Sequence, residues 1–143
     1  MTITTIRDER GLLAALSLED KVRLLTGADN WRTCPSPAIG LRSKVVSDGP
    51  AGVRGTTMDE RNPASSLPSP SALGATWDPA LVQTLAAALG TEARSKGVDI
   101  LLAPTVNIMR TPLGGRAYEG FGEDPFLVAR TAVAGSRGRR RRG

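Results

Sequence analysis

The clearest hydrophobic pattern in the chain follows Asp78-Pro79, a pair typical of a helix start. An acidic side chain can cap the first turn, and proline accepts the first helical position because an N–H there has no helical partner. Three leucines then recur at a spacing of four residues, on one face: Leu81, Leu85 and Leu89. Gly97 can take the left-handed conformation that ends many helices. The pattern predicts a helix from Pro79 that ends at Gly97.

Two weaker helix patterns flank this one. Ser17 is a suitable N-cap for a short helix, with Gly27 as its left-handed C-terminal residue. The apolar positions of that helix share one face: Leu18, Val22 and Leu25. A loop of proline and small residues is expected from there to Gly40. Asp124-Pro125 repeats the start signal and predicts a helix that runs towards Val133.

Two short apolar runs predict strands, and each is followed by a loop that holds charged residues. Residues 44–47 stop at the turn 48–50, and residues 98–103, directly after the long helix, are apolar on both faces. Such a run is typical of a buried strand in a parallel sheet. Residues 55–71 are rich in proline and small polar residues, so we expect a loop. Strands alternating with helices predict an α/β fold, in which ligands bind at the C-terminal ends of strands, here 48–50 and 105–123.

Length and charge narrow the range of architectures. The chain has 143 residues, well short of the roughly 250 typical of a complete (β/α)8 barrel, and its 40% of hydrophobic residues is enough for a packed core. Five arginines lie in residues 136–143, and removing them from the 19 Lys and Arg leaves 14, which match the 14 Asp and Glu. The net charge of +5 therefore belongs to the tail rather than to the rest of the chain.

Several kinds of site are excluded by residue types. The chain has no histidine, which excludes Ser-His-Asp and Cys-His nucleophiles and most zinc sites, and we expect neither a metal nor a cofactor. Cys34 has no second cysteine to pair with, so we interpret it as a structural or solvent-exposed residue without a chemical role. Residues 1–10 lack the features of a signal peptide, and no apolar run approaches the roughly 18 residues of a membrane span. We therefore expect a cytoplasmic protein without a membrane partner.

The candidate chemistry lies in the two loops at the predicted strand ends. The Asp48 carboxylate can accept hydrogen bonds from two adjacent hydroxyls of a sugar, although Asp before Gly-Pro is also a common opener of an Asx turn. Arg116 follows two glycines and offers a rigid fork of donors to hydroxyl or carboxylate ligands. Glu119 can orient Arg116 through an ion pair, or can form a pair of acid and base carboxylates with Glu123.

At this point several long motifs, in the same order, resemble the opening of the glycoside hydrolase family 3 β-glucosidases. The resemblance covers about residues 12–134, and several motifs together make it more specific than any single glycine pattern. These motifs are SLEDK (17–21), LLTGADNW (24–31), SDGPAGVR (47–54), LAPTVNI (102–108) and PLGGRAYEGFGEDP (112–125).

The resemblance implies a partial (β/α)8 TIM-type barrel, with about its first three strands and their helices in residues 1–135. Members of the family are retaining glycosidases that remove terminal non-reducing β-D-glucosyl residues, so a β-glucoside or oligosaccharide is the implied substrate. The resemblance gives substrate-binding roles to Asp48 and Arg116, a supporting role to Glu119, and makes Arg54 a weaker candidate.

The chain also departs from the family pattern. The family's Lys-His-Phe strand, its nucleophilic Asp and its acid/base Glu have no counterpart in these 143 residues. We therefore expect no catalytic residue in this chain, and an isolated chain that is inactive and poorly soluble. Beyond Val133 the sequence becomes a basic, low-complexity segment, 136–143, which we interpret as a disordered or frameshifted tail.

The alternative is a small non-catalytic module that binds a sugar or, through its basic tail, a nucleic acid. The aromatic content of 3% argues against both forms, because such surfaces commonly stack bases or sugar rings on aromatic side chains. We accordingly do not expect a nucleic-acid partner.

Overall fold

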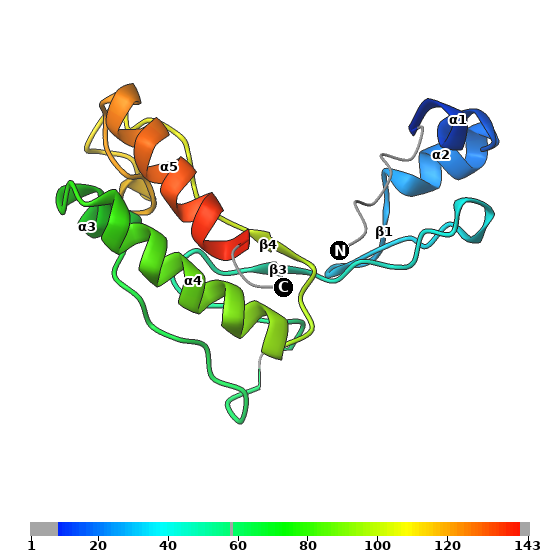
Figure 1. Cartoon of the computed structure of the whole chain (residues 1–143), viewed down its shortest axis with the longest axis horizontal. Coiled ribbons are helices and arrows are strands. Elements are labelled where there is room, and N and C mark those ends of the chain that lie inside the picture. Colours follow the sequence, from blue (N-terminus) through cyan, green and yellow to red (C-terminus); the bar gives the residue numbers. More distant parts are fainter. Residues whose placement is uncertain (1–8, 58, 141–143) are drawn as a thin grey trace, which may run out of the picture. The chain divides into compact units, whose positions relative to one another are not determined.

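The structure is a computed structural model that describes residues 9–57 and 59–140. It divides into two compact units, Met1–Val45 and Val46–Gly143, which are described separately (Figure 1). Most of the start segment, residues 1–10, and the last three residues of the tail lie outside the described residues.

The first unit contains two short helices, a hairpin and a 3-10 turn. These elements are α1 (Glu9–Ala14), α2 (Leu18–Leu24), β1 (Gly27–Asp29), β2 (Arg32–Thr33) and η1 (Pro37–Ile39). The predicted cap of α2 is confirmed, because the Ser17 hydroxyl accepts a hydrogen bond of 3.0 Å from the Asp20 N–H. The β1–β2 hairpin lies where only a loop was expected; the Asp29 carboxylate holds its turn by accepting from the Trp31 N–H and from Arg32.

The prediction that Gly27 ends α2 in a left-handed conformation is wrong. Helix α2 ends at Leu24 with Leu25 as a right-handed cap, and Gly27 opens strand β1 instead. The Leu25 N–H donates to the Val22 carbonyl, and the Thr26 N–H and hydroxyl both donate to the Arg23 carbonyl. The last carbonyls of the helix are satisfied in this way, so no left-handed residue is needed.

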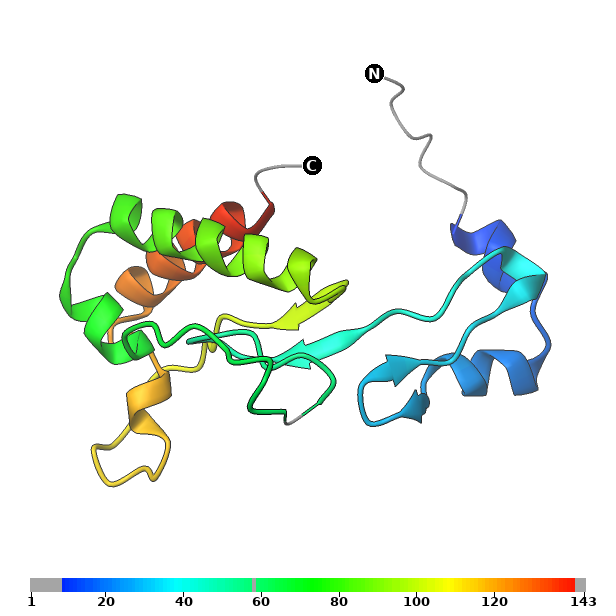
Figure 2. The same ribbon diagram turned by 90° about the horizontal axis from the view of Figure 1, so that it is seen from below.

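The second unit is built on a parallel strand pair, which confirms the α/β prediction. Strand β3 (Val46–Asp48) pairs in parallel with β4 (Ile100–Leu102), and Ser47 lies opposite Leu101. The chain passes between them through α3 (Pro70–Ala75) and α4 (Pro79–Ser95). Helices α4 and α5 (Pro125–Arg140) lie side by side in Figure 1 and on one side of the strand pair in Figure 2. The described residues of this unit hold two parallel strands rather than about three.

The prediction that the second strand is buried on both faces is wrong. Ser47 is fully buried, whereas Ile100 and Leu102 are 45% and 55% exposed. Successive side chains of a strand point to opposite faces, so Ile100 and Leu102 share the face opposite to that of Leu101. Helices cover one face only, because a two-stranded sheet with two helices has nothing to place on the other.

Helix α4 confirms the predicted cap but buries a different face. The Asp78 carboxylate accepts from the N–H groups of Ala80 and Leu81, and Gly97 follows the helix with φ +67°. The buried side of the helix consists of Val82, Ala86, Leu89, Gly90 and Ala93. Leu89 of the predicted stripe is therefore in the core, but Leu81 is 40% exposed. The small residues Ala86, Gly90 and Ala93 lie on the buried face because they let α5 approach α4 closely.

Helix α5 begins as predicted and continues through most of the basic segment. The Phe126 N–H donates to the Asp124 carboxylate, and the helix runs to Arg140, past the tail boundary expected at residue 136. Gly138 is buried, and a Cβ there would collide with the Gln83 carbonyl and the Ala86 side chain of α4. The absence of a side chain at this position thus allows the helix to pack along α4 beyond residue 136.

Helix α3 was not expected. Ser69 caps it by accepting from the Ala72 N–H, and Pro70 occupies its first position, the same signals as in α4 over only six residues. No helix among the described residues is both long and apolar enough to cross a membrane.

Candidate functional site

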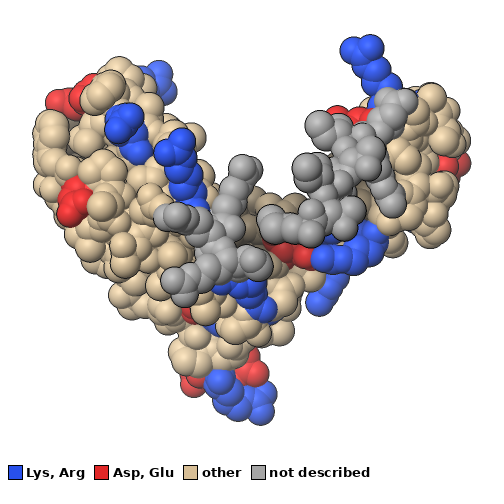
Figure 3. Space-filling model, viewed as in Figure 1, with Lys and Arg blue, Asp and Glu red and all other residues tan. Residues whose placement is uncertain are grey.

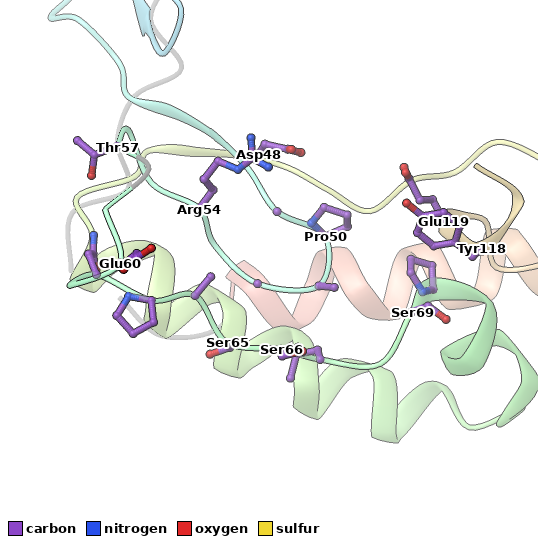
Figure 4. Close-up of a pocket in the computed structure, with 18 of the residues that line it drawn as sticks. Asp48, Pro50, Arg54, Thr57, Glu60, Ser65, Ser66, Ser69, Tyr118 and Glu119 are labelled. Atoms are coloured by element: carbon purple, nitrogen blue, oxygen red, sulfur yellow. The ribbon is translucent and has the colours of Figure 1, made fainter. Parts of the chain in front are cut away.

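The four residues predicted to bind substrate line one hollow of the second unit. The hollow measures about 770 Å³, and its walls include Asp48, Arg54, Arg116 and Glu119 (Figure 4). Two segments far apart in sequence form it, the loop after β3 and the loop after β4. The end of β3 and the loops that follow both parallel strands therefore line one space, as expected for a ligand site in an α/β fold.

Asp48 is the last residue of β3. Among the described residues, the hydrogen bonds that hold the following turn at Asp48 are made by its main-chain carbonyl and by Ser47, not by the Asp48 carboxylate that an Asx turn would use. The Arg54 N–H and the Ser47 hydroxyl both donate to the Asp48 main-chain carbonyl, at 3.1 and 2.8 Å. Ser47 is fully buried, and its hydroxyl also accepts from the Gly55 N–H at 2.9 Å. Main-chain carbonyls and a buried hydroxyl hold the loop at Asp48, while the Asp48 side chain lines the hollow.

The turn after Asp48 depends on two glycines. Gly49 has φ +138°, a conformation that side chains disfavour, and a Cβ there would collide with the Gly52 carbonyl. A Cβ on Gly52 would in turn collide with the Ser65 carbonyl. The turn therefore packs against the loop segment around Ser65 with no room for side chains, which fixes the direction of the wall beside Asp48.

Arg116 and Glu119 form a bidentate ion pair in the part of the lining that comes from the loop after β4. The Arg116 Nε and Nη2 donate to the two carboxylate oxygens of Glu119 at 2.7 and 2.6 Å, across the 3-10 turn η2 (Ala117–Glu119). The Arg116 side chain is 82% exposed and that of Glu119 is 15% exposed. Glu119 is thus the anchored partner, and Arg116 presents its remaining donors to the hollow.

The charges of the site act on one another. The hydrogen bond from Arg116 lowers the pKa of Glu119 below its ordinary value, although burial opposes this. The pKa of Arg116 is raised, first by its hydrogen bond to Glu119 and, more weakly, by the charge of Asp48. The charge of Asp48 thus favours the protonated form of Arg116 in the same direction as Glu119, but more weakly.

Arg54 and Glu123 differ in their relation to this site. Arg54 comes from the loop after β3 and, in the view of Figure 4, extends towards Asp48. Glu123 is exposed and, among the described residues, does not belong to the lining of the hollow. The structure accordingly does not bring Glu119 and Glu123 together as the acid and base of one site.

Sequence reasoning missed the later part of the loop after β3 as a wall of the hollow. This part consists of Thr57 and residues from 59–70, a segment expected only to be a loop, and includes the polar side chains of Asp59, Glu60 and Asn62. On the face shown in Figure 3, acidic and basic side chains occur in small separate groups among uncharged ones. A signal was available: a loop that begins directly after a strand end has to pass the ligand site of an α/β fold.

The sequence of this site matches a known family. Residues 18–143 match the family model of the glycosyl hydrolase family 3 N terminal domain, which is most of the chain. The chain belongs to glycosyl hydrolase family 3. The resemblance inferred from the motifs is thereby confirmed.

The relatives within family 3 are much longer than this chain. Probable β-glucosidase H of Emericella nidulans is 46% identical over 123 residues, which are 86% of this chain and 15% of that protein. Probable β-glucosidase K of Aspergillus fumigatus is 45% identical over 127 residues, 89% of this chain and 17% of that protein. The chain thus spans about one sixth of the length of these curated relatives.

Solved family 3 structures share this fold. The β-glucosidase of Kluyveromyces marxianus in complex with glucose matches 92% of this chain and 16% of its own, with 35% identity and a TM-score of 0.84. β-Glucosidase 3B of Thermotoga neapolitana in complex with α-D-glucose matches 91% of this chain and 21% of its own, with 36% identity and a TM-score of 0.79.

Proposed function

We propose that this chain forms the sugar-binding part of a β-glucosidase active site, which holds the terminal non-reducing β-D-glucosyl residue of a β-glucoside or oligosaccharide. The observation that carries the proposal is the hollow that Asp48 and Arg116 share, between the loops that follow two parallel strands. A charged acceptor and a charged donor that line one hollow suit the hydroxyls of a pyranose, which both donate and accept hydrogen bonds. Two related β-glucosidase structures, those of Thermotoga neapolitana and Kluyveromyces marxianus, are complexes with glucose, which supports the same choice of ligand.

Each charged residue has a distinct role in this proposal. Asp48 accepts hydrogen bonds from two adjacent hydroxyls, and a charged acceptor makes such bonds stronger than a neutral one. Arg116 donates to the same ring from the other side. Glu119 acts through Arg116, since both of its oxygens are occupied by the guanidinium. Arg54, which lines the hollow beside Asp48, adds a second donor.

The bond-breaking step requires groups beyond those of this site. A retaining glycosidase needs a nucleophilic carboxylate and a general acid about 5–5.5 Å apart, and the acid needs a raised pKa. Glu119 does not suit the second role, because its hydrogen bond from Arg116 lowers its pKa. We therefore infer that residues 1–143 bind the sugar without hydrolysing the glycosidic bond, and that the catalytic pair belongs to the remaining length of the relatives.

A partial (β/α)8 barrel is the architecture that we propose for this chain. The unit β3–α4–β4–α5 contains the strand–helix–strand repeat of such barrels. The apolar side chains of Ile100 and Leu102 stand on the strand face that the helices leave uncovered. In a closed barrel this face lines the interior, where layers of branched apolar residues pack.

The proposal is tested by titrating glucose into the ¹⁵N-labelled chain and following amide chemical shifts. We expect shifts around Asp48 and Arg116 with a Kd on the order of a few millimolar, because glucose is small and this is one part of a site. Asp48→Asn should weaken glucose binding at least tenfold, because it removes the free energy of about one charge-assisted hydrogen bond. Glu123→Gln, outside the hollow, should leave glucose binding unchanged. Shifts elsewhere, or an Asp48→Asn variant that binds normally, would overturn the proposal.

The inactivity of the chain has a separate test. Residues 1–143 should hydrolyse an aryl β-glucoside, measured as release of the phenol, no faster than the Asp48→Asn variant does at the same concentration. Turnover above that variant would show that a complete catalytic pair is present in this chain.

A further inference from the structure

Helix α4 carries an ion pair that is almost entirely shielded from solvent. Glu92 and Lys96 lie one helical turn apart, with Nζ and Oε1 at 3.1 Å, and their side chains are 13% and 8% exposed. Pairs at this spacing on a helix usually lie in solvent and add little to stability. Burial of this pair needs further hydrogen bonds to offset the loss of hydration.

Those hydrogen bonds go to the main chain of the loop that walls the hollow. The Glu92 carboxylate accepts from the Val53 N–H at 3.1 Å and from the Ser65 N–H at 2.9 Å. The Lys96 ammonium donates to the Val53 carbonyl at 2.6 Å and to the Pro63 carbonyl at 2.9 Å. With its bond to Glu92, all three donors of Lys96 are used.

The four bonds join the two limbs of one loop. Val53, which is fully buried, belongs to the limb that leaves β3, and residues 63–65 belong to the limb that returns to α3. The limbs also meet where the Leu67 N–H donates to the Ala51 carbonyl at 2.8 Å. Between the limbs, residues 54–57 and 59–62 bring Arg54, Asp59 and Glu60 to the wall of the hollow.

We propose that Glu92 and Lys96 are positioning residues that hold this loop, residues 53–57 and 59–65, in the shape required for sugar binding beside Asp48. The inference rests on the proposed function for its ligand. Apolar side chains at positions 92 and 96 could fill the same space, but they cannot fix the direction of main-chain N–H and C=O groups. The pair therefore specifies backbone geometry rather than merely filling the core.

The hydrogen-bond partners are tested directly by amide exchange. In the unaltered chain the Val53 and Ser65 amides should exchange at least tenfold more slowly than the amide of Glu60, which lies on the exposed part of the same loop. Glu92→Gln keeps the shape but replaces one of the two acceptor oxygens with an N–H₂ group, which cannot accept. The protection of the amide that faces this group, Val53 or Ser65, should therefore fall at least tenfold, while amides of β3 and β4 keep theirs. Equal exchange of Val53, Ser65 and Glu60 in the unaltered chain would overturn the inference, whether or not any variant folds.

Two further variants separate positioning from simple packing. Glu92→Met combined with Lys96→Met removes both charges and keeps the volume, a replacement that restores or raises stability where an ion pair only fills a core. We expect this double variant to fold, to leave Val53 and Ser65 unprotected, and to bind glucose at least threefold more weakly. Arg94→Met, on the exposed side of the same turn, should change neither the protection of the Val53 and Ser65 amides nor the affinity for glucose. A double variant with normal glucose binding would show that the pair is structural only.

Failure of the proposed function gives a different result. If the unaltered chain binds no glucose, the sugar site is wrong, and with it the role of the loop in binding. The exchange rates of Val53 and Ser65 still report whether Glu92 and Lys96 hold the loop.

Discussion

At the scale of single residues, the turn after β3 depends on Gly49. Its φ of +138° and the collision of a Cβ with the Gly52 carbonyl leave no space for any side chain. Gly49→Ala should lower the free energy of unfolding by about 1–3 kcal/mol, the cost of such a conformation for a residue with a side chain, and should abolish glucose binding. Urea unfolding measures the first effect. The matched control is Gly115→Ala, where a Cβ meets nothing within 4 Å, and equal losses in both variants would contradict this account.

The Arg116–Glu119 pair gives a prediction about pH. The hydrogen bond from Arg116 holds the pKa of Glu119 below its ordinary value in the folded chain, so the carboxylate stays charged as the pH falls to the usual Glu value of about 4.3. The pair is therefore complete at neutral pH and is lost only when the pH falls through the lowered pKa. The resonance of the Arg116 Nε proton should remain in place down to about pH 4.3 and move only below it.

The variant Glu119→Gln tests whether this pair orients Arg116. At neutral pH it should weaken glucose binding about three- to tenfold, the order of one misaligned hydrogen bond, and leave the midpoint of thermal unfolding unchanged. A lower unfolding midpoint with normal binding would assign Glu119 to the fold instead of the site.

The residues of the site differ in how far the sequence could predict them. Asp48 and Arg116 could be located because each follows an apolar strand and sits among glycines, and loop position alone then brings them together. Glu92 and Lys96 could not, because opposite charges four residues apart on a helix have the pattern of an ordinary surface pair. Their decisive partners are main-chain groups 27 to 43 residues away, which carry no side-chain signal.

At the scale of elements, local sequence signals predict where helices begin, but they do not predict which face of a helix is buried. Asp78-Pro79 and Asp124-Pro125 mark the starts of α4 and α5 because a cap is decided by neighbouring residues. Helix α3 and the β1–β2 hairpin were missed because six, three and two residues are too few to show a period. Which face of α4 is buried depends on α5, and no local pattern reports that contact.

Two leucines of α4 test which face of the helix is buried. The i, i+4 pattern treats Leu81 and Leu89 as equivalent, but Leu89 is buried and Leu81 is 40% exposed. Leu89→Ala should cost about 2–5 kcal/mol of unfolding free energy, and Leu81→Ala less than about 1 kcal/mol, because only the first leaves a cavity. Urea unfolding of both variants decides the matter. Similar costs would mean that the predicted stripe, and not the observed face, is the buried one.

At the scale of the whole molecule, the second unit has one covered and one uncovered sheet face. Helices α4 and α5 cover the face of Ser47, and Ile100 and Leu102 stand on the other. Exposed apolar side chains beside each other on a strand pair favour association between molecules. We therefore predict that the exposed face with Ile100 and Leu102 causes the poor solubility expected from the sequence.

That surface can be altered without touching the core. Ile100→Thr combined with Leu102→Thr keeps β-branched or strand-compatible side chains while removing apolar area, so the unfolding free energy should change by less than about 1 kcal/mol. The concentration at which the chain begins to precipitate should rise. Leu101→Thr, on the covered face, is the matched control and should destabilise the chain without improving solubility. A double variant that unfolds while Leu101→Thr stays folded would mean that the apolar face is covered in solution, which would require another part of a barrel or a second molecule to lie against it.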